Sequence, residues 1–508
     1  MHGRTFGSVL DACAESFGNE TALVHDGRRR SYADAIGDLR ALGRGLRSAG
    51  LSPGERVAIL MKDTPDLVTT LYGALWAGIT IVPLNTRLAL EDHVYMVQDT
   101  GARALMFDEA MAGCAMDISS RVDLELFACA TDGALGSGHA AGPGSPEDVD
   151  PESPVWIQYT GGTTGLPKGA VHSHRTMLTS LLSCALEFDI RPGETCAFVA
   201  PLTHSGAGMF LPVWMRGGTN ILLGGFDPEA LLATIEAERV TSTLMVPTML
   251  AVLLDHPAFS DYDLSSLRTI VYGAAPIGRT LLEAALDRLG PVLLQAYGQT
   301  EAFCQITVLT KDDHVRARER PEILASCGRP VPLCDLRVVD EDLRPVTRGE
   351  TGEIVVRGPH TILGYLGKPD ETAKTLVDGW LRTGDLGRRD EDGFVYLVDR
   401  RSDMIITGGF NVFPKEVEHV LDRHDAVSAV CVIGVPDDKW GEAVKAVVVP
   451  SRQVDPDELI AFVKAHKGSV MAPKSVDFVD ALPVTSLGKV DKKALRRQYW
   501  AGRERAVN

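Results

Sequence analysis

Segments with strand patterns alternate with segments with helix patterns along most of this chain, and this alternation limits the folds open to it. Residues 31–50 carry apolar side chains at helical spacing, and residues 54–61 and 101–108 are strand-like. The alternation resumes over 190–310, where several strand-like segments end in small residues. Strands that alternate with helices form parallel sheets with helices on both faces. We therefore predict an α/β fold whose strand ends lie near a ligand.

The chain is too long for a single hydrophobic core, since it has 508 residues. Residues 131–150 are rich in Gly, Ala and Pro without periodicity, which predicts a surface linker. Short strand-like segments and turns over 327–400 indicate a β subdomain, and the C-terminal part combines strands with a helix capped by Asp455. We predict a large N-terminal domain over 1–401, with parallel-type sheets, flanking helices and the β subdomain, and a small α+β domain over 402–508.

The charge and the cysteine pattern exclude several classes of function. A net charge of −17 argues against nucleic acid or anionic lipid as the main partner. The nine cysteines form no CxxC pair and the thirteen histidines show no metal-binding spacing. This pattern favours a thiol-rich intracellular protein over a disulfide scaffold or a zinc site. The first residues lack an apolar core after a basic end, so we expect no signal peptide and a cytoplasmic location.

One uncharged segment, residues 67–86, is long enough to cross a membrane. Gly73, Gly78 and Pro83 interrupt it. A buried helix followed by a buried strand explains these interruptions better than a membrane span. We therefore expect no transmembrane segment here.

The stretch YTGGTTGLPKGAVHSH, residues 159–174, follows the strand-like segment 154–159 and is rich in glycine. From Thr160 to Gly169 it holds four glycines, three threonines and Lys168, without the spacing of a Walker A or GxGxxG motif. A flexible turn would explain the glycines alone. Free backbone N–H groups, hydroxyls and an ammonium together are suited to cradle an anion. The stretch predicts a phosphate site at the carboxyl end of a strand, where open α/β sheets bind ligands.

Three further motifs each allow two interpretations. In LLQAYGQTEAF, Tyr297, Thr300 and Glu301 are either a core tyrosine beside surface residues or a base-stacking ring, a phosphate contact and a Mg²⁺ ligand. In DGWLRTGD, Asp385 lies either in an ordinary turn or against ribose hydroxyls. Lys489 in LPVTSLGKVDKKAL would on its own be an ordinary solvated lysine.

Taken together and in this order, the four motifs resemble those of the adenylate-forming superfamily of acyl-CoA synthetases, amino-acid adenylation domains and luciferases. The resemblance covers nearly the whole chain, from SYADA at residue 31 to KVDKKAL at the C-terminal end. GGFNVFPKEVE, DGWLRTGD and GVPDDKWGE are most similar to fatty-acyl-CoA ligases and their aryl-acid relatives. The resemblance implies ATP, Mg²⁺ and coenzyme A as cofactors and co-substrates and a small carboxylic acid as substrate. We expect a monomer or a homodimer.

The resemblance implies a nucleotide site built from the matching residues. The ATP- and AMP-binding residues would be Thr160, Gly161, Gly162, Thr163, Thr164, Gly165, Lys168, Gly273, Ala274, Ala275, Gln295, Ala296, Tyr297, Gly298, Thr300, Asp385, Arg400 and Lys489. Residues 160–168 would hold the pyrophosphate end, Tyr297 would stack on the base and Gln295 would lie near the adenine amine. Asp385 would take both ribose hydroxyls, with Arg400 beside it.

The resemblance also implies an acyl pocket, a CoA channel and a hinge. The acyl pocket would be lined by His204, Gly206, Ala207, Met249 and Phe303, and the pantetheine channel by Gly408 and Gly409. Small residues in this pocket suit a medium- to long-chain fatty acid, which we rank first. Trp214, Met249 and Phe303 could equally shape a slot for an aryl or arylpropenoic acid, and a cyclic or steroid-derived side-chain acid stays open. The hinge residue would be Ser402, where the family commonly has Asp or Lys.

The chemistry implied is attack of a carboxylate on the α-phosphorus of ATP, which releases pyrophosphate. Lys489, Thr300, Glu301 with Mg²⁺, and His204 would be the catalytic residues, because two anions meet and the site must supply cations. The small mobile C-terminal domain would then rotate so that the CoA thiol displaces AMP. An adenylation domain that loads a carrier protein is the alternative, and the lack of an acid near His204 counts against an amino-acid substrate. A non-catalytic nucleotide-binding regulator is disfavoured because Lys489, Glu301 and Asp385 are all present.

Overall fold

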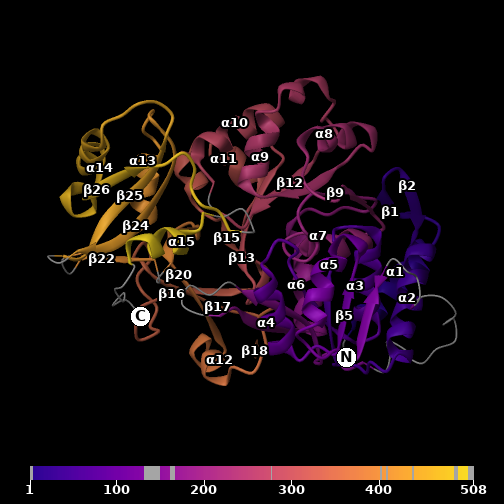
Figure 1. Ribbon diagram of the computed structural model, residues 1–508. Helices are drawn as coiled ribbons and strands as arrows, with labels where there is room; N and C mark the ends of the chain where they lie inside the picture. The colour runs from indigo at the N-terminus through magenta and orange to yellow at the C-terminus, as the bar shows by residue number, and fades with distance from the viewer. Residues whose placement is uncertain are drawn as a thin grey trace. The chain divides into compact units, whose positions relative to one another are not determined.

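The computed structural model describes residues 4–130, 135, 149–160, 166–275, 277–400, 403–407, 410–437, 440–485 and 490–500. Its contacts divide the chain into two compact units (Figure 1). The first unit comprises residues 1–336 and 356–381, and the second comprises 337–355 and 382–508.

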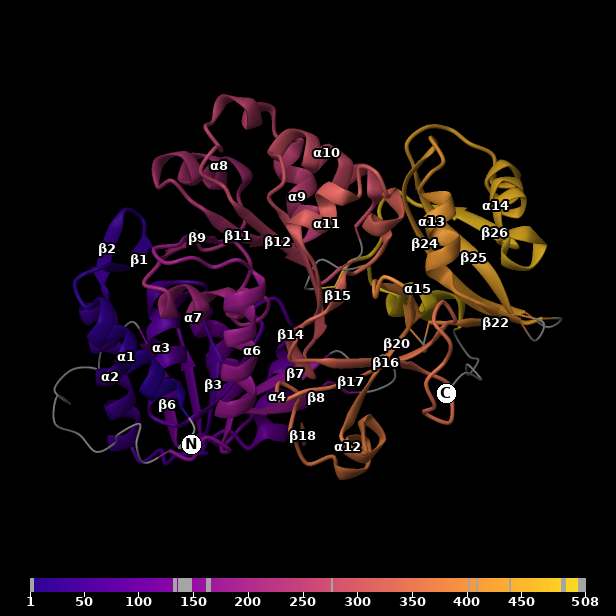
Figure 2. The same ribbon diagram turned by 180° about the vertical axis from the view of Figure 1, so that it is seen from behind.

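A nine-stranded sheet forms the larger part of the first unit. Its order is β15 (Arg329–Pro330), β14 (Ala302–Leu309), β13 (Leu293–Gln299), β12 (Thr269–Gly273), β11 (Ser242–Met245), β9 (Thr195–Phe198), β10 (Thr219–Leu222), β1 (Thr21–His25) and β2 (Arg28–Ser31). The strands from β13 to β1 in this order are parallel, whereas β14 runs antiparallel to β13. Helices α8 (Pro228–Ala237), α9 (Pro247–Leu254) and α10 (Arg279–Leu289) cover one face, and α6 (His174–Glu187) and α7 (Ala207–Met215) lie on the other (Figures 1 and 2).

A seven-stranded sheet is the second large sheet of the first unit. Its order is β18 (Gly364–Tyr365), β8 (Lys168–Ser173), β7 (Pro154–Thr160), β4 (Thr80–Pro83), β3 (Arg56–Leu60), β5 (Ala104–Phe107) and β6 (Leu126–Cys129). The strands from β7 to β6 in this order are parallel, and β8 pairs antiparallel with β7. The helices that accompany this sheet and fill the remainder of the unit are α1 (Phe6–Phe17), α2 (Tyr32–Ser48), α3 (Pro65–Trp76), α4 (Leu90–Thr100), α5 (Ala112–Ser119), α11 (Lys311–Arg316) and α12 (Pro369–Thr375), with the 3₁₀ turns Glu109–Met111, Pro257–Asp261 and Pro321–Ala325.

A cluster of aromatic rings joins elements from across the first unit. Trp214 of α7 is fully buried, and its Nε1 donates to the Ala22 carbonyl at 2.8 Å. Its ring lies 4.8 Å from Phe210 and 5.9 Å from both Tyr32 of α2 and Tyr72 of α3. The suggestion that Trp214 shapes a substrate slot is therefore wrong. Its indole packs in the core, where the hydrogen bond to β1 fixes it.

Two smaller sheets complete the fold. One has the order β16 (Asp335–Val339), β17 (Gly352–Arg357), β20 (Trp380–Arg389) and β19 (Leu376–Val377), with β21 (Val395–Arg400) paired to β20. The other, in the second unit, has the order β23 (Phe410–Val412), β22 (Ile405–Thr407), β25 (Gly441–Pro450) and β24 (Val427–Asp437), with β26 (Ser475–Phe478) paired to β25. Helices α13 (Pro414–Leu421) and α14 (Pro456–Met471) pack against this second sheet through a core that includes Val417, Val432 and Leu459, and α15 (Lys492–Tyr499) contributes Leu495 to a second cluster.

The structure confirms the predicted α/β class, with parallel sheets and flanking helices, and the α+β character of the C-terminal part. The segment 67–86 contains most of α3 and all of β4, which are buried as expected. Over the described ranges, no helix is long and apolar enough to cross a membrane. Asp455 caps α14 as predicted, since its side chain accepts from the Asp457 N–H.

The segment after the glycine-rich stretch begins with β8, which pairs antiparallel with β7, and continues with α6. Residues 382–400 group with the C-terminal residues by contacts, whereas the boundary at residue 402 stays a prediction because Arg401 and Ser402 lie outside the described residues. The predicted linker 131–150 is likewise described only at residues 135, 149 and 150.

Several buried histidines in the first unit make the stability of the fold depend on pH. Burial lowers the pKa from 6.5 to about 4 in His172, His174, His314 and His360. His314 illustrates the setting, because its Nε2 lies 2.8 Å from the Tyr272 hydroxyl and its Nδ1 lies 2.7 Å from the Thr310 carbonyl. In each case the folded protein holds the neutral ring, while the unfolded chain binds a proton at a higher pH.

We expect the free energy of unfolding to fall as the pH drops from 7 to 5. The stabilisation that comes from keeping these rings neutral is fully present above the unfolded pKa of about 6.5. By pH 5, each of these histidines has lowered the free energy of unfolding by about 2 kcal/mol. Urea unfolding followed by fluorescence measures this slope. Replacement of His314 by Gln should reduce the slope by about 1.4 kcal/mol per pH unit, whereas the exposed His466→Gln should not change it. Equal slopes in both variants and the parent protein would contradict the assignment.

Candidate active site

The parallel strands β12 and β13 approach each other closely where β12 ends. Gly273 lies opposite Ala296, and a Cβ atom at Gly273 would stand 2.2 Å from the Ala296 carbonyl oxygen. Ala274 follows with φ of 62°, a left-handed conformation that is costly for a residue with a side chain. The two strands can therefore meet here only because position 273 has no side chain. The structure therefore brings together Gly273 and Ala296, both predicted to bind the nucleotide and here taken as one wall of an adenine slot.

Gln295 on β13 carries a buried side-chain oxygen. Its Oε1 has no hydrogen-bond partner in the described part of the chain. A buried carbonyl oxygen without a donor is costly, so such groups normally meet a ligand or a water. An amine donor would satisfy this oxygen, which fits the predicted place of the adenine amine.

The chain reverses sharply just beyond Tyr297. A Cβ at Gly298 would lie 2.3 Å from the Cys304 carbonyl oxygen, and the pairing of β13 with β14 is irregular between Tyr297 and Gln299. Cys304 itself has a φ of 70°. The reversal places Thr300 and Glu301 in the turn between the two strands.

Thr300 and Glu301 are held by side chains that the sequence analysis did not identify. The Nε2 atom of His172 lies 2.8 Å from the Thr300 carbonyl oxygen. The Tyr365 hydroxyl donates to Glu301 Oε1 at 2.7 Å, and burial raises the pKa of Tyr365, which keeps this donor protonated. His172 and Tyr365 lie far from the turn in sequence, so only the pairing of β8 with β18 reveals them.

Lys168 begins β8, opposite Thr160 at the end of β7. Its Nζ lies 2.5 Å from Glu371 Oε2 and 5.2 Å from the centre of the Tyr365 ring. The hydrogen bond from Lys168 is the main cause that lowers the pKa of Glu371. Tyr365 therefore stands between the lysine predicted to bind phosphate and the carboxylate predicted to bind Mg²⁺.

The residues around Glu301 fit a magnesium ion only with help from a substrate. Over the described ranges, no group of three or more His, Cys, Asp or Glu side chains could hold a metal. Magnesium is commonly held by one or two carboxylates together with phosphate oxygens and water. Glu301 can supply such a carboxylate, and a triphosphate would supply the other oxygens.

Of the predicted acyl-pocket residues, His204 and Gly206 lie in the turn before α7, Ala207 on α7, Met249 on α9 and Phe303 on β14. His204 Nδ1 lies 3.2 Å from Thr203 Oγ1, and its Nε2 lies 3.5 Å from Gln158 Nε2. Gln158 in turn accepts from Trp156 Nε1 at 2.9 Å, and the Trp156 ring lies 6.1 Å from that of Phe303. The structure thus connects His204 with Phe303 through two side chains of β7.

The remaining predicted residues of the pocket differ in how they are placed. Gly206 precedes α7, where a Cβ would lie 2.6 Å from the Ala200 carbonyl oxygen, and Ala207 is the buried first residue of α7. Met249 is half-buried on α9.

In the second unit, Asp385 and Arg400 face each other across β20 and β21. Arg400 Nε lies 3.2 Å from Asp385 Oδ1, so the predicted neighbours are adjacent. The other predicted site residues lie outside the described residues: Gly161, Gly162, Thr163, Thr164, Gly165, Ser402, Gly408, Gly409 and Lys489.

Comparison with known proteins decides the family. Residues 10–366 match the model of the AMP-binding enzyme family, and residues 416–489 match that of the AMP-binding enzyme C-terminal domain. The chain belongs to the AMP-binding enzyme family. It is an ATP-dependent, AMP-forming ligase of the adenylate-forming acyl-CoA synthetase type.

Its relatives act on different acids. A medium/long-chain-fatty-acid–CoA ligase of Mycobacterium tuberculosis is 42% identical over 91% of this chain and 84% of that protein. A feruloyl-CoA synthase of an Amycolatopsis species is 40% identical over 98% of this chain and 100% of that protein. The solved structure of an amide bond synthetase from Marinactinospora thermotolerans superimposes with a TM-score of 0.89 and 35% identity, covering 97% of this chain and 100% of that one.

The close approach at Gly273 leads to a direct test of the nucleotide site. In Gly273→Ala, the added methyl group must push β12 away from the Ala296 carbonyl, and such overpacking costs about 1–3 kcal/mol. We expect AMP binding, measured by calorimetry, to weaken by about tenfold or more. Gly278→Ala is the matched control, because a Cβ there meets nothing within 4 Å. Equal AMP affinities in the two variants would remove Gly273 from the adenine slot.

Proposed function

We propose that this chain is an acyl-CoA ligase that activates a medium- to long-chain fatty acid with ATP and transfers the acyl group to CoA. The arrangement around Tyr365 carries the proposal. A triphosphate in this chemistry needs a cation beside its oxygens and a carboxylate that holds Mg²⁺. Lys168 and Glu301 offer both, because the ammonium lies over the Tyr365 ring and the carboxylate accepts from its hydroxyl.

In the first half-reaction, the substrate carboxylate attacks the α-phosphorus of ATP and pyrophosphate leaves. We assign Thr300 to the α-phosphate and Lys168 to the departing end, while Gln295 accepts from the adenine amine. Magnesium held by Glu301 would neutralise phosphate charge. Lys489 would bridge the substrate carboxylate and the α-phosphate, which lowers the repulsion between two anions as they approach.

In the second half-reaction, the CoA thiol attacks the acyl-AMP carbonyl and AMP leaves. Asp385 and Arg400 would hold the ribose, and Gly408 and Gly409 would line the path of the thiol. Ser402 would be the hinge about which the small domain turns between the two steps. The acyl-AMP is a reactive mixed anhydride, so it has to be kept from water until the thiol arrives.

An aryl or arylpropenoic acid is the second candidate substrate. The aromatic side chains Trp156 and Phe303 near His204 support it, because aromatic rings make favourable edge and face contacts with another ring. A fatty acid ranks first because Gly206 and Ala207 leave the start of the pocket without bulky side chains. A carrier protein as acyl acceptor is the alternative to CoA.

We expect a CoA thioester, AMP and pyrophosphate when the protein meets a panel of carboxylic acids with ATP, Mg²⁺ and CoA. Pyrophosphate release gives the rate, and mass spectrometry identifies the product. Omission of CoA should leave acyl-AMP. If acyl-AMP forms with CoA present but never becomes a thioester, the acyl acceptor is not CoA but a carrier protein or an amine. Absence of pyrophosphate release with every acid would contradict the proposed function.

The role of Lys489 in the first half-reaction can be tested separately from the second half-reaction, in which the CoA thiol attacks. Lys489→Ala should slow acyl-AMP formation by about 100-fold or more, because it removes a cation from the point where the anions meet. The same variant should still convert supplied acyl-AMP and CoA to thioester. Lys493→Ala, an exposed lysine of the same segment, should keep both rates. Equal loss of both steps in Lys489→Ala would refute the assignment.

A further inference from the structure

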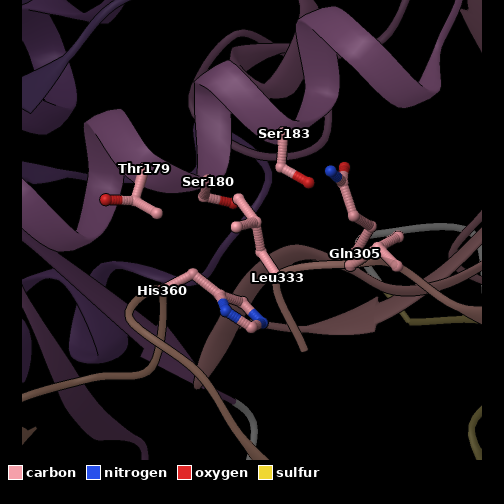
Figure 3. A pocket seen from close by; sticks show the side chains of 7 residues that line it. Thr179, Ser180, Ser183, Gln305, Leu333 and His360 are labelled. Atoms are coloured by element: carbon pink, nitrogen blue, oxygen red, sulfur yellow. The ribbon is translucent and has the colours of Figure 1, made fainter. Parts of the chain in front are cut away.

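Some buried polar side chains lie outside the predicted site. In the first unit, Gln305 and His360 lie between α6 and β14 (Figure 3), where the space among the side chains is too small to admit a water molecule. They leave no room for a ligand. In the second unit, charged side chains gather where α15 meets α13 and the end of β21. This second cluster takes no direct part in either half-reaction.

Two cations on one face of α15 form ion pairs within the second unit. Lys492 Nζ lies 2.8 Å from Glu418 Oε1 on α13, and Arg496 Nη2 donates to Asp403 Oδ1 at 2.8 Å. The four side chains are only 14–19% exposed. Because Lys492 and Arg496 are four residues apart, they share one face of the helix. That face attaches α15 to two other segments of the unit.

The surroundings keep these groups charged although they are largely buried. Burial alone would lower the pKa of Lys492, but the carboxylates of Glu418 and Asp399 raise it. Burial acts to raise the pKa of Asp403, whereas Arg496 and Lys492 lower it. Removal of one partner from such a pair is costly, because the other charge is left without water or a counter-ion. The ion pairs therefore hold α15 firmly to α13 and to the chain at Asp403.

The helix begins three residues after Lys489. Val484 and Val490 form an isolated antiparallel bridge, and the Asp491 N–H donates to the Pro483 carbonyl at 2.7 Å. These contacts hold together the two ends of the short segment that contains Lys489. Because α15 starts directly after Asp491, the place of both ends depends on the place of the helix.

The same cluster reaches both sides of the predicted hinge residue Ser402. Asp403, which pairs with Arg496, follows Ser402 directly in the sequence. Asp399 precedes it on β21, is 2% exposed and accepts from a backbone N–H near the start of α13 at 3.0 Å. Burial raises the pKa of Asp399, and the nearby Lys492 lowers it. The cluster thus connects the predicted hinge with the helix that follows Lys489.

We propose that Lys492 and Arg496 are positioning residues for Lys489. By fixing α15 to Glu418 and Asp403, they set where the ammonium of Lys489 stands when the substrate carboxylate meets the α-phosphate. The inference rests on the proposed acyl-CoA ligase function and adds two residues to its first half-reaction. A cation held in place beforehand needs no reorganisation in the transition state, so its displacement slows acyl-AMP formation. The second half-reaction does not use this cation and is unaffected.

The test removes one ion pair without leaving a buried charge behind. The double variant Lys492→Met with Glu418→Gln loses both charges, and uncharged replacements of a buried ion pair are often tolerated. The new amide can still accept from the Val432 N–H, as the Glu418 carboxylate does at 2.8 Å. Melting temperatures report whether each variant folds.

We expect the two half-reactions to respond differently. In the double variant, kcat for acyl-AMP formation, followed by pyrophosphate release, should fall by about tenfold or more, while the KM for ATP changes by less than about threefold. This split arises because the displaced cation acts in the transition state rather than in binding. Conversion of supplied acyl-AMP and CoA to thioester should stay within about twofold of the parent rate.

Neighbouring residues of the same helix supply matched controls. Lys493→Met and Arg497→Met each remove the same charge as the test variants, but from exposed side chains, and should keep both rates. Arg496→Met tests the second ion pair independently and should give the pattern of the double variant. Arg496→Lys, which keeps a cation beside Asp403, should restore most of the lost rate.

A comparison in a second background separates positioning from stability. In Lys489→Ala, the ion pair has no cation left to place. Adding Lys492→Met and Glu418→Gln should then slow the residual acyl-AMP formation by no more than about twofold, because residues that act as a unit are not additive. A purely structural role would slow both backgrounds by the same factor.

The outcomes separate this inference from the proposed function. Equal factors in the two backgrounds, equal loss of both half-reactions, or an unchanged first half-reaction would each overturn the positioning role and leave the ligase function standing. Acyl-AMP formation at the parent rate in Lys489→Ala would also overturn it, because there would be no cation to position. No pyrophosphate release by the parent protein with any acid of the panel would refute the ligase function, and the positioning role would fall with it.

Discussion

The reversal of the chain between β13 and β14 is the constraint on which the rest of the site depends. β13 is the last of six parallel strands in the sheet, and it pairs antiparallel with β14. The turn between them is so tight that a Cβ at Gly298 would clash with the Cys304 carbonyl. Gln295 and Tyr297, predicted to bind the nucleotide, precede the turn, Thr300 and Glu301 lie within it, and Phe303, predicted to line the acyl pocket, follows it. One short stretch thereby carries residues predicted to contact both substrates. A change in the geometry of this turn would move both partners of the reaction together.

Lys168, predicted to bind phosphate, forms an ion pair with Glu371 that costs little to exchange. Lys168 and Glu371 are 29% and 36% exposed at their side chains, and half-exposed pairs of this kind contribute about 0–1 kcal/mol. A phosphate oxygen can therefore take the ammonium from Glu371 without a large penalty. Tyr365 keeps Glu301 oriented through a neutral hydroxyl, so arrival of a metal does not first require separation of an ion pair. In a chain with a net charge of −17, we expect an anionic substrate to bind where such a local cation is available.

Local patterns in the sequence predicted most of the strands and the helices of the sheets, together with the segments that would carry the site. They did not predict β8, because KGAVHS has only one β-branched residue and forms a strand by pairing with β7 and β18. They assigned Trp214 to a possible slot because AGMFLPVWM is apolar on all sides and does not show which face is buried. The partners His172, Tyr365 and Glu371 depend on contacts between distant segments, which no local pattern contains.

An apolar pocket discriminates only weakly between acids of similar shape. One methylene changes binding in a hydrophobic pocket by about 1–3 kcal/mol, so chain length alone separates neighbouring acids poorly. The predicted acyl pocket of this chain begins with the small residues Gly206 and Ala207, while Phe303 follows the turn that carries Thr300 and Glu301. Adenylation chemistry common to the family and a choice of acid particular to this chain can therefore be set by separate residues.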